Sequence, residues 1–333
     1  MSAARKASAR QGLLAAYGPI LAVAAVLALL PLATSANTVL NAMVLALLIA
    51  LAGQGWNILG GYGGQFSFGH AAFFGTGAYL TAILQARLGV NAYAAFATAV
   101  ATGAAVGAAI GYLSFRSGLR GSYFALVTLA FAEVFRIIAN AAPFTGGAAG
   151  TLIKLDVRPE TFQFASRAVY FWIALGLVTL VLAATRAMER SRFGAYLVAI
   201  RENEDAAKAL GVNTLAVKLQ AITASAAITA AAGAFYAQYF LFVDSTIAYG
   251  SWISVEALLV PIVGGLGTVF GPLIGALALH GLAEATKAAA GRIPGLDLAL
   301  YGSLLVLAIA FAPNGVHGLL ARLRGGLSSR SAS

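Results

Sequence analysis

Long apolar runs alternate with short polar or glycine-rich breaks along nearly the whole chain. Because a helix needs about 20 mostly apolar residues to cross a bilayer core, cutting the runs at these breaks predicts about ten transmembrane helices. The runs cover residues 17–34, 39–59, 66–85, 93–115, 123–141, 168–185, 217–242, 253–263, 269–285 and 298–312. The pattern therefore predicts an all-α polytopic membrane protein with one transmembrane domain over 17–313, flanked by tails at 1–16 and 314–333.

One polar stretch, residues 199–211, stands between two of these runs within a longer connection at 186–217. Its apolar positions Ile200, Ala207 and Leu210 fall on one face of a helix, while its charged positions fall on another. The spacing predicts one amphipathic helix over 197–210. A polar helix between apolar transmembrane segments is typical of a docking element for a soluble partner.

The charges of this stretch support the same helix. Arg201 with Asp205, and Glu204 with Lys208, are opposite charges four residues apart, each pair stabilising a helix by about 0.3 kcal/mol. Gly211 stands where a helix C-cap glycine is expected. The predicted helix therefore carries its own stop signal.

Composition supports a membrane protein, since 60% of the 333 residues are hydrophobic and only 10% are charged. The formal charge of +10 would favour nucleic-acid binding in a soluble protein. Here it is better explained by the excess of Lys and Arg on the cytoplasmic side of membrane helices. We place the N-terminus in the cytoplasm, and an even number of helices then makes the C-terminus cytoplasmic too. With this orientation, few of the 21 basic residues lie outside: Arg87, Arg136, Lys154, Arg158, Arg167, Lys287 and Arg292. This arrangement makes 186–217 cytoplasmic and the connection at 143–167 external.

The N-terminus allows two interpretations. Arg5, Lys6 and Arg10 precede an apolar run that ends in small residues, as in a secretory signal peptide. An uncleaved first helix is favoured, because its removal would place the mature N-terminus outside without improving the charge bias.

Glycines spaced by four predict where helices approach closely, since such a stripe lets two backbones meet. Two predicted spans carry such triplets: Gly103, Gly107 and Gly111 in one, and Gly267, Gly271 and Gly275 in the other. Two further glycine-rich turns, 60–63 and 264–267, are expected on the cytoplasmic side.

Enzymatic chemistry is not indicated. The chain has no phosphate-binding Gly-x-x-x-x-Gly-Lys-Ser/Thr loop and no His-Glu-x-x-His pair, and Gln65 replaces the first glycine of a hydrolase elbow at residues 65–69. With no cysteine and three histidines, a metal site is not expected. No cofactor is expected on this chain, and any ATP-driven step needs a partner.

Two carboxylates, Glu133 and Glu256, lie inside predicted spans, where a charge is costly and normally faces a cavity or a partner. Both are candidates for a translocation pathway. For Glu133 a structural role is equally favoured, because Arg136 lies one turn further on.

Asn57, Gln65 and Ser67 surround the glycine break at 60–64 and are the other pathway candidates. Broken backbone at membrane depth is tolerated where it is buried in protein or lines a water-filled cavity. A pathway and a tight structural turn both fit this pattern.

Three stretches resemble the permease subunits of ATP-binding-cassette importers for branched-chain amino acids, specifically the M-type subunit. Residues 56–79 (WNILGGYGGQFSFGHAAFFGTGAY) are similar to the long glycine-rich signature of that family. Residues 119–133 (LRGSYFALVTLAFAE) with 145–147 (TGG) resemble its mid-chain signature. Asp205-Ala206-Ala207 followed by Gly211 resembles the Glu-Ala-Ala-x-x-x-Gly loop that importer permeases present to their ATPases. Asp205 replaces the usual Glu and keeps its charge, whereas alanines at 148 and 149 replace residues that are commonly polar in relatives.

The resemblance implies a permease of the bacterial inner membrane that works with a second permease, two ATPase subunits and an external solute-binding protein. ATP and Mg²⁺ would bind the ATPases, and alternating access would move the solute inward. The residues expected to couple the chain to its ATPases are Arg201, Glu204, Asp205, Ala206, Ala207, Leu210 and Gly211. Ala206 and Ala207 would fit into a groove on the ATPase, and the charged residues would set the register.

Other functions stay open. Related permeases handle urea or short amides, which is the nearest variant. A stand-alone channel or an ion-coupled secondary transporter would explain buried carboxylates and glycine breaks without partners, but leaves the polar helix at 197–210 without a role. A membrane enzyme would need a convergent acid, base or metal cluster, and none is visible.

Overall fold

The computed structural model describes residues 3–34 and 36–290, and beyond them residues 295, 296, 299, 300, 302, 303 and 306. The tenth span predicted at 298–312 falls largely outside the described residues. The C-terminal tail predicted at 314–333 lies wholly outside them.

Helices make up nearly all of the described chain. The long ones are α1 (Ala3–Ala28), α3 (Asn37–Trp56), α4 (His70–Leu88), α5 (Ala92–Arg116), α6 (Gly121–Ala141), α7 (Arg167–Glu189), α10 (Thr214–Phe240), α12 (Ser251–Gly264) and α13 (Gly271–Ala290). The short ones are α2 (Leu30–Ala33), α8 (Arg192–Glu202), α9 (Glu204–Ala209), α11 (Ser245–Ala248) and the single turns η2 (Pro143–Thr145), η3 (Gly147–Ala149) and η4 (Pro159–Thr161). Strands β1 (Thr151–Leu152) and β2 (Phe242–Val243) form one short antiparallel ladder that pairs Thr151 with Val243. The prediction of an all-α fold is confirmed.

Among the described residues, seven helical segments are long and apolar enough to cross a membrane. They are Ala15–Ala33, Asn37–Tyr62, Ala92–Arg116, Gly121–Ala141, Arg167–Glu189, Thr214–Phe240 and Ser245–Gly264. A multi-pass membrane protein is therefore supported, while the predicted count of about ten is not confirmed. α4 is outside this set although it is nearly enclosed: Phe73 and Phe74 are fully buried, and its surroundings are protein, which tolerates the small and polar residues of this helix.

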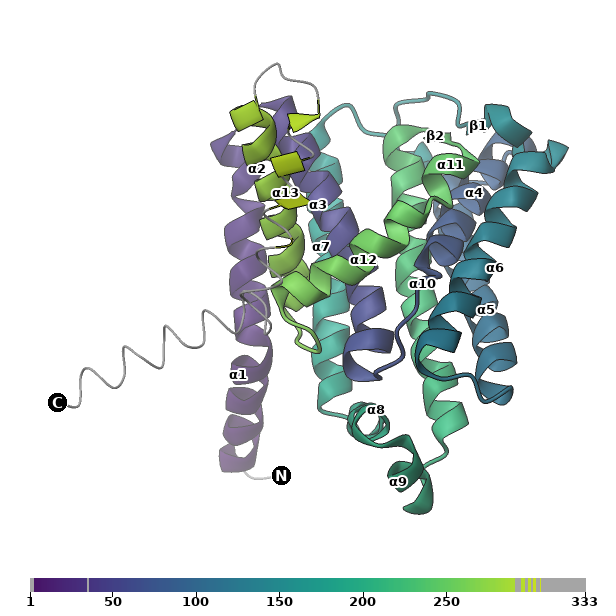
Figure 1. The fold of residues 1–333 in the computed structure, drawn as a ribbon. Helices are drawn as coiled ribbons and strands as arrows, with labels where there is room; N and C mark the ends of the chain where they lie inside the picture. The colour runs from purple at the N-terminus through teal and green to yellow at the C-terminus, as the bar shows by residue number, and fades with distance from the viewer. Residues whose placement is uncertain are drawn as a thin grey trace.

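The helices run roughly parallel, and short elements close the two ends (Figure 1). α8 and α9 lie together at one end, where the first turns of α1 also lie, and β1, β2 and α11 lie at the opposite end. In this view α1, α3, α7 and α13 stand on one side and α4, α5, α6 and α10 on the other, and α12 crosses obliquely between the sides. The start of α1 and the polar stretch therefore lie at the same end of the bundle.

α10 holds the centre of the bundle and packs against α3, α4 and α5. Its buried side chains are small on most turns, so neighbouring helices approach it closely. Large apolar side chains fill the remaining space, and Trp56 and Phe235 are 0% and 1% exposed. Close packing around α10 fixes the position of the polar α8–α9 segment that immediately precedes it.

α3 ends in a π-helical turn, η1 (Asn57–Tyr62), which widens the helix before the chain leaves it. Trp56 stabilises the exit, since its indole Nε1 donates a hydrogen bond of 2.8 Å to the Ser67 carbonyl oxygen. A π-helical turn displaces backbone groups from their usual partners and is frequent at functional sites. The glycine break predicted at 60–64 is therefore a distinct structural element.

Candidate coupling site

The polar stretch forms two helices, α8 and α9, and the prediction of one continuous helix over 197–210 is wrong. Asn203 separates them with an extended backbone (φ −159°, ψ 104°). Its side-chain Oδ1 accepts a hydrogen bond of 2.9 Å from the Ala206 amide, which makes it the N-cap of α9. Asn is a strong N-cap, and here local capping outweighs the helical periodicity of the longer segment.

α9 ends in a Schellman motif at Gly211, which has φ +87°. The Val212 amide donates to the Ala207 carbonyl at 3.1 Å, and the Gly211 amide to the Lys208 carbonyl at 3.0 Å. Leu210 is 87% exposed and does not join the buried face that the single-helix pattern gave it. Ala207 is 3% exposed and packs into the core of this chain, so of the two adjacent alanines only Ala206 is open to a partner.

The acidic residues of α9 bind partners outside the α8–α9 segment. Asp205 accepts a hydrogen bond of 3.0 Å from Arg120 Nη2, just before α6, and the guanidinium holds the pKa of Asp205 below its ordinary range. Glu204 pairs with Lys218 Nζ at 2.7 Å and with Arg120 Nε at 3.3 Å. Neither pair predicted along one helix forms: the break at residue 203 separates Arg201 from Asp205, and Glu204 faces Arg120 and Lys218 although Lys208 lies on the same helix. That prediction is wrong.

Arg201, the last but one residue of α8, reaches the glycine break of α3. Its Nη1 donates a hydrogen bond of 3.0 Å to the Gly61 carbonyl oxygen, and its Nη2 pairs with Glu202 at 2.8 Å. The close approach depends on glycine, since a Cβ atom at Gly64, where φ is +67°, would lie 2.8 Å from Arg201 Cγ. The candidate coupling segment, formed by α8 and α9, is therefore attached to the transmembrane bundle at this break.

Within the described residues, no hydrogen bond or ion pair joins one pathway candidate to another. Asn57 and Ser67 are fully buried, and both bind backbone: Ser67 Oγ accepts from the Gly69 amide at 3.1 Å. Gln65 is half-buried and donates to the Gly63 carbonyl at 3.1 Å. These contacts support the interpretation of a structural turn for this region.

The two carboxylates lie on different helices, α6 and α12. Glu133 is exposed on α6 and accepts a hydrogen bond of 2.9 Å from Arg136 Nε, the neighbour expected to neutralise it. Glu256 is half-buried on α12, and it makes no ion pair with any residue of the described ranges. A pathway role for either carboxylate stays a prediction.

Asn57 fastens the π-helical turn to the loop between α12 and α13. Its Oδ1 accepts from the Gly267 amide at 2.9 Å, and its Nδ2 donates to the Thr268 carbonyl at 3.0 Å. This contact joins the two glycine-rich turns that the sequence places on one side of the membrane. Their backbones nearly touch, since a Cβ at Gly61 would lie 2.8 Å from the Gly267 nitrogen.

We expect Asn57→Leu, which keeps the side-chain size, to lower the stability of the folded protein. The Gly267 amide and the Thr268 carbonyl would lose their partners, at a cost of about 1–3 kcal/mol for each buried group. Thermal unfolding of the purified protein in detergent measures this loss. Asn91→Leu, at an exposed N-cap of α5, is the matched control with a smaller shift, and equal midpoints for the two variants would contradict the role of Asn57.

The first glycine stripe faces α10. Cβ atoms at Gly103 and Gly107 would each lie 2.2 Å from an alanine Cβ of α10, and one at Gly111 would lie 2.4 Å from Ile222 Cγ2. These glycines therefore hold α5 and α10 together at close range.

The second stripe is only partly helical. Gly271 and Gly275 belong to α13 and face the end of α12, where a Cβ at Gly275 would lie 1.8 Å from the Val260 carbonyl oxygen. Gly267 lies before α13, in a turn with φ +66°, so placing it on the same helical stripe was wrong. A turn that ends at Thr268, whose hydroxyl accepts from the Gly271 amide, fixes this boundary.

Two residues of the coupling segment's environment, Arg120 and Lys218, were not predicted. Lys218 is 4% exposed, near the start of α10, and its ammonium lies 4.8 Å from the centre of the Phe115 ring. A lone basic residue at the start of an apolar run is the signal that could have identified it. Arg120 lies within the 119–133 signature, but no local pattern indicates its partners, which lie 84 and 85 positions away.

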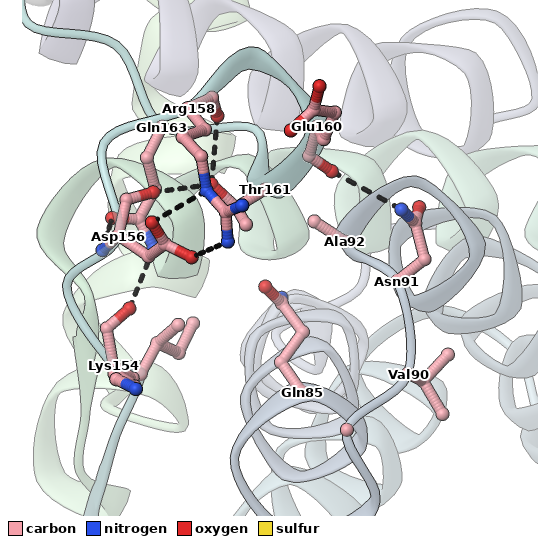
Figure 2. Close-up of a pocket in the computed structure, with 12 residues that line it drawn as sticks. Gln85, Val90, Asn91, Ala92, Lys154, Asp156, Arg158, Glu160, Thr161 and Gln163 are labelled. Atoms are coloured by element: carbon pink, nitrogen blue, oxygen red, sulfur yellow. Dashed lines mark hydrogen bonds and ion pairs between the residues drawn. The ribbon is translucent and has the colours of Figure 1, made fainter.

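A polar cavity of about 290 Å³ lies at the opposite end, between the start of α5 and the 151–163 connection. Figure 2 shows Gln85 between Asn91 on one wall and the Asp156–Arg158 pair on the other. Arg158 Nε donates to Asp156 Oδ1 at 2.8 Å and holds the pKa of that carboxyl below its usual range. Lys154 and Glu160 also line the cavity, so it presents both signs of charge.

The fold defines a multi-pass membrane protein with a polar helical segment at one end. The family described as branched-chain amino acid transport system / permease component matches residues 38–309, and the chain belongs to this family. It is 28% identical over 299 residues to the high-affinity branched-chain amino acid transport system permease protein LivM of Salmonella typhimurium, covering 82% of this chain and 68% of the relative. BraD of Pseudomonas aeruginosa, also a permease protein of such a system, is 25% identical over 84% of this chain and 94% of its own length. LivH of Escherichia coli is 31% identical over 44% of this chain and 46% of its own length. No solved structure gives a significant match.

Proposed function

We propose that this chain is the membrane-spanning permease subunit of an ATP-binding-cassette importer for branched-chain or related amino acids. Membership of the permease family is the observation that carries the proposal. The exposed α8–α9 segment gives the chain a surface on which ATPase subunits can act. ATP hydrolysis on those subunits would drive alternating access, and this chain would bind no cofactor itself.

The proposed orientation places α8, α9 and both termini in the cytoplasm of a bacterial cell, with the permease in the inner membrane. The position of the N-terminus at the α8–α9 end supports it, together with the excess of basic residues there. The solute-binding protein would then meet the β1–β2 end, where the cavity of Figure 2 offers Lys154 and Glu160. With α4, α13 and the 298–312 run added to the seven apolar segments, the full membrane domain would have about ten helices.

A second permease would complete the pathway. Glu133 is exposed on the surface of this chain, which favours a route formed between two subunits. LivM and LivH are both permease proteins of the branched-chain amino acid system, and similarity to both favours a partner from the same family. Urea or short amides are the alternative solutes, and a self-sufficient channel or secondary transporter is the alternative of another class.

We expect Leu210→Asp to reduce co-purification of the ATPase subunits with the permease. Leu210 is 87% exposed beside Ala206, so the substitution changes the proposed docking surface without disturbing the core of this chain. Leu155→Asp is the matched control, because Leu155 is 70% exposed in the connection at the other end. Quantifying ATPase bound per permease compares the two variants. Uptake of a labelled amino-acid panel by wild-type vesicles, with and without ATP, tests the alternative, since ATP-independent uptake by the isolated chain would contradict the proposal.

A further inference from the structure

α8 and α9 make polar contacts with different parts of the transmembrane bundle, although α8 also packs against α7 and α10. α8 reaches the end of α3 through Arg201, whose guanidinium donates to the Gly61 carbonyl oxygen at 3.0 Å. No backbone amide of the described residues donates to this oxygen outside the regular helices. The π-helical turn therefore leaves the Gly61 carbonyl oxygen available to a side chain, and the charged guanidinium of Arg201 is a strong donor for it.

The contact at Gly61 extends to α12 and α13. The Gly267 turn lies against Gly61, and Asn57 ties both turns together through its bonds to Gly267 and Thr268. A Cβ at Gly267 would lie 3.1 Å from Arg201 Nη1, so this side chain sits between the two turns. Leu197, one turn earlier on α8, is fully buried with its Cδ2 3.3 Å from where a Gly63 Cβ would be. Movement of α8 therefore acts on the ends of α3 and α12 together.

The polar contacts of α9 are with α10 and with the start of α6. Glu204 Oε1 lies 2.7 Å from Lys218 Nζ of α10, and Glu204 Oε2 lies 3.3 Å from Arg120 Nε, just before α6. Asp205 adds a contact of 3.0 Å with Arg120. The Glu204–Lys218 pair is nearly enclosed, with side chains 13% and 4% exposed, so it is a firm connection.

A single residue joins the two attachments. Asn203 has extended backbone, and no α-helical turn continues through it. Its side chain caps α9, while its amide donates to the Ala199 carbonyl of α8 at 3.0 Å. Rotation about this residue changes the angle between α8 and α9 without breaking a helical hydrogen bond within either.

We propose that α8 and α9 form a two-armed linkage hinged at Asn203, in which Arg201 moves the glycine turns of α3 and α12–α13 while Glu204 holds α10 and the start of α6. The proposal rests on the proposed function, since an ATPase must supply the displacement. Arg201 is a positioning residue: it transmits force between the ATPase-facing segment and the bundle. Opening of the pathway then depends on the angle at the hinge.

Arg201→Ala tests the α8 arm in the complete assembly reconstituted with its ATPases and binding protein. The variant is expected to keep its ATPase subunits and to hydrolyse ATP, while solute moved per ATP falls by about tenfold or more. Arg201→Lys retains a donor for the Gly61 carbonyl and is expected to recover part of the loss. Arg116→Ala removes the same charge from an exposed position at the end of α5, outside the docking segment, and is expected to leave the ratio unchanged.

The readouts separate the two proposals. Loss of ATPase co-purification from the wild-type chain would overturn the proposed function. A normal ratio of uptake to hydrolysis in Arg201→Ala, with ATPases bound, would overturn the linkage alone. The chain has no cysteine, so spin labels at Ala195→Cys on α8 and Lys208→Cys on α9 report the hinge angle even if Arg201→Ala fails to fold. ATP is expected to change the distance between the labels, and an unchanged distance during active transport would overturn the hinge.

Discussion

Gly77→Leu is expected to prevent stable folding of the membrane domain. At Gly77 the backbones of α4 and α10 touch: a Cβ atom there would lie 2.0 Å from the Ala230 carbonyl oxygen and 2.7 Å from its carbonyl carbon. Overpacking among side chains costs about 1–3 kcal/mol, and here the obstacle is backbone, which cannot rotate away as a side chain can. The same two helices also touch at Gly233 of α10, where a Cβ atom would lie 1.9 Å from the Phe74 carbonyl oxygen of α4.

Expression level and thermal unfolding in detergent measure this effect. Gly176→Leu on α7 is the control, because Gly176 is exposed and no atom lies within 4 Å of its Cβ position. We expect the control to fold normally, and its unfolding midpoint to equal or exceed that of the wild type, since leucine favours helix over glycine by about 1 kcal/mol. Similar midpoints for Gly77→Leu and Gly176→Leu would show that α4 and α10 do not touch as described.

The second large effect is expected from Glu204→Gln. Lys218 is 4% exposed, and its nearest carboxylate oxygen is Glu204 Oε1 at 2.7 Å. Removing one member of a buried ion pair leaves the other charge uncompensated, which costs about 3–5 kcal/mol. The Phe115 ring, 4.8 Å from the ammonium, compensates only a small part of this loss.

The double variant Glu204→Gln with Lys218→Met distinguishes charge from shape. Replacing both members of a buried pair with uncharged residues of similar size is often neutral, so the double variant is expected to recover most of the stability. Chemical unfolding in detergent follows the single and double variants. If Glu204→Gln alone proved as stable as the wild type, the pair would contribute nothing, and α9 would be held by Arg120 instead.

The helices of this chain could be predicted well because their apolar runs are long. The runs at 39–59, 93–115, 123–141, 168–185 and 217–242 all correspond to observed helices with boundaries shifted by a few residues. The number of membrane crossings was less predictable, because hydropathy measures contact with lipid, whereas α4 is enclosed by protein. Periodicity also cannot distinguish a continuous helix from two helices separated by one capping residue, and Asn203 produced that error at 197–210.

The candidate site was predictable in position but not in its contacts. The polar stretch and Gly211 were identified from sequence, whereas the partners of Glu204 and Arg201 lie on segments distant in the chain. Asn57 shows the same limit: a polar residue beside a glycine break fits a pathway or a fastened turn, and only the positions of Gly267 and Thr268 distinguish them. Leu210 is exposed because the chain breaks its helix at residue 203, and the spacing of apolar residues does not indicate this break.

The direct contact between α4 and α10 also determines which parts of the molecule can change shape. Backbone carbonyl groups press against Gly77 and Gly233, so at these points no side chains that could change rotamer lie between the two helices. α4 and α10 must therefore move as one rigid unit through a transport cycle, and any bending must occur in the neighbouring helices. α12 is suited to that task, because Pro261 interrupts its hydrogen bonding one turn before Gly265, where φ is +136°.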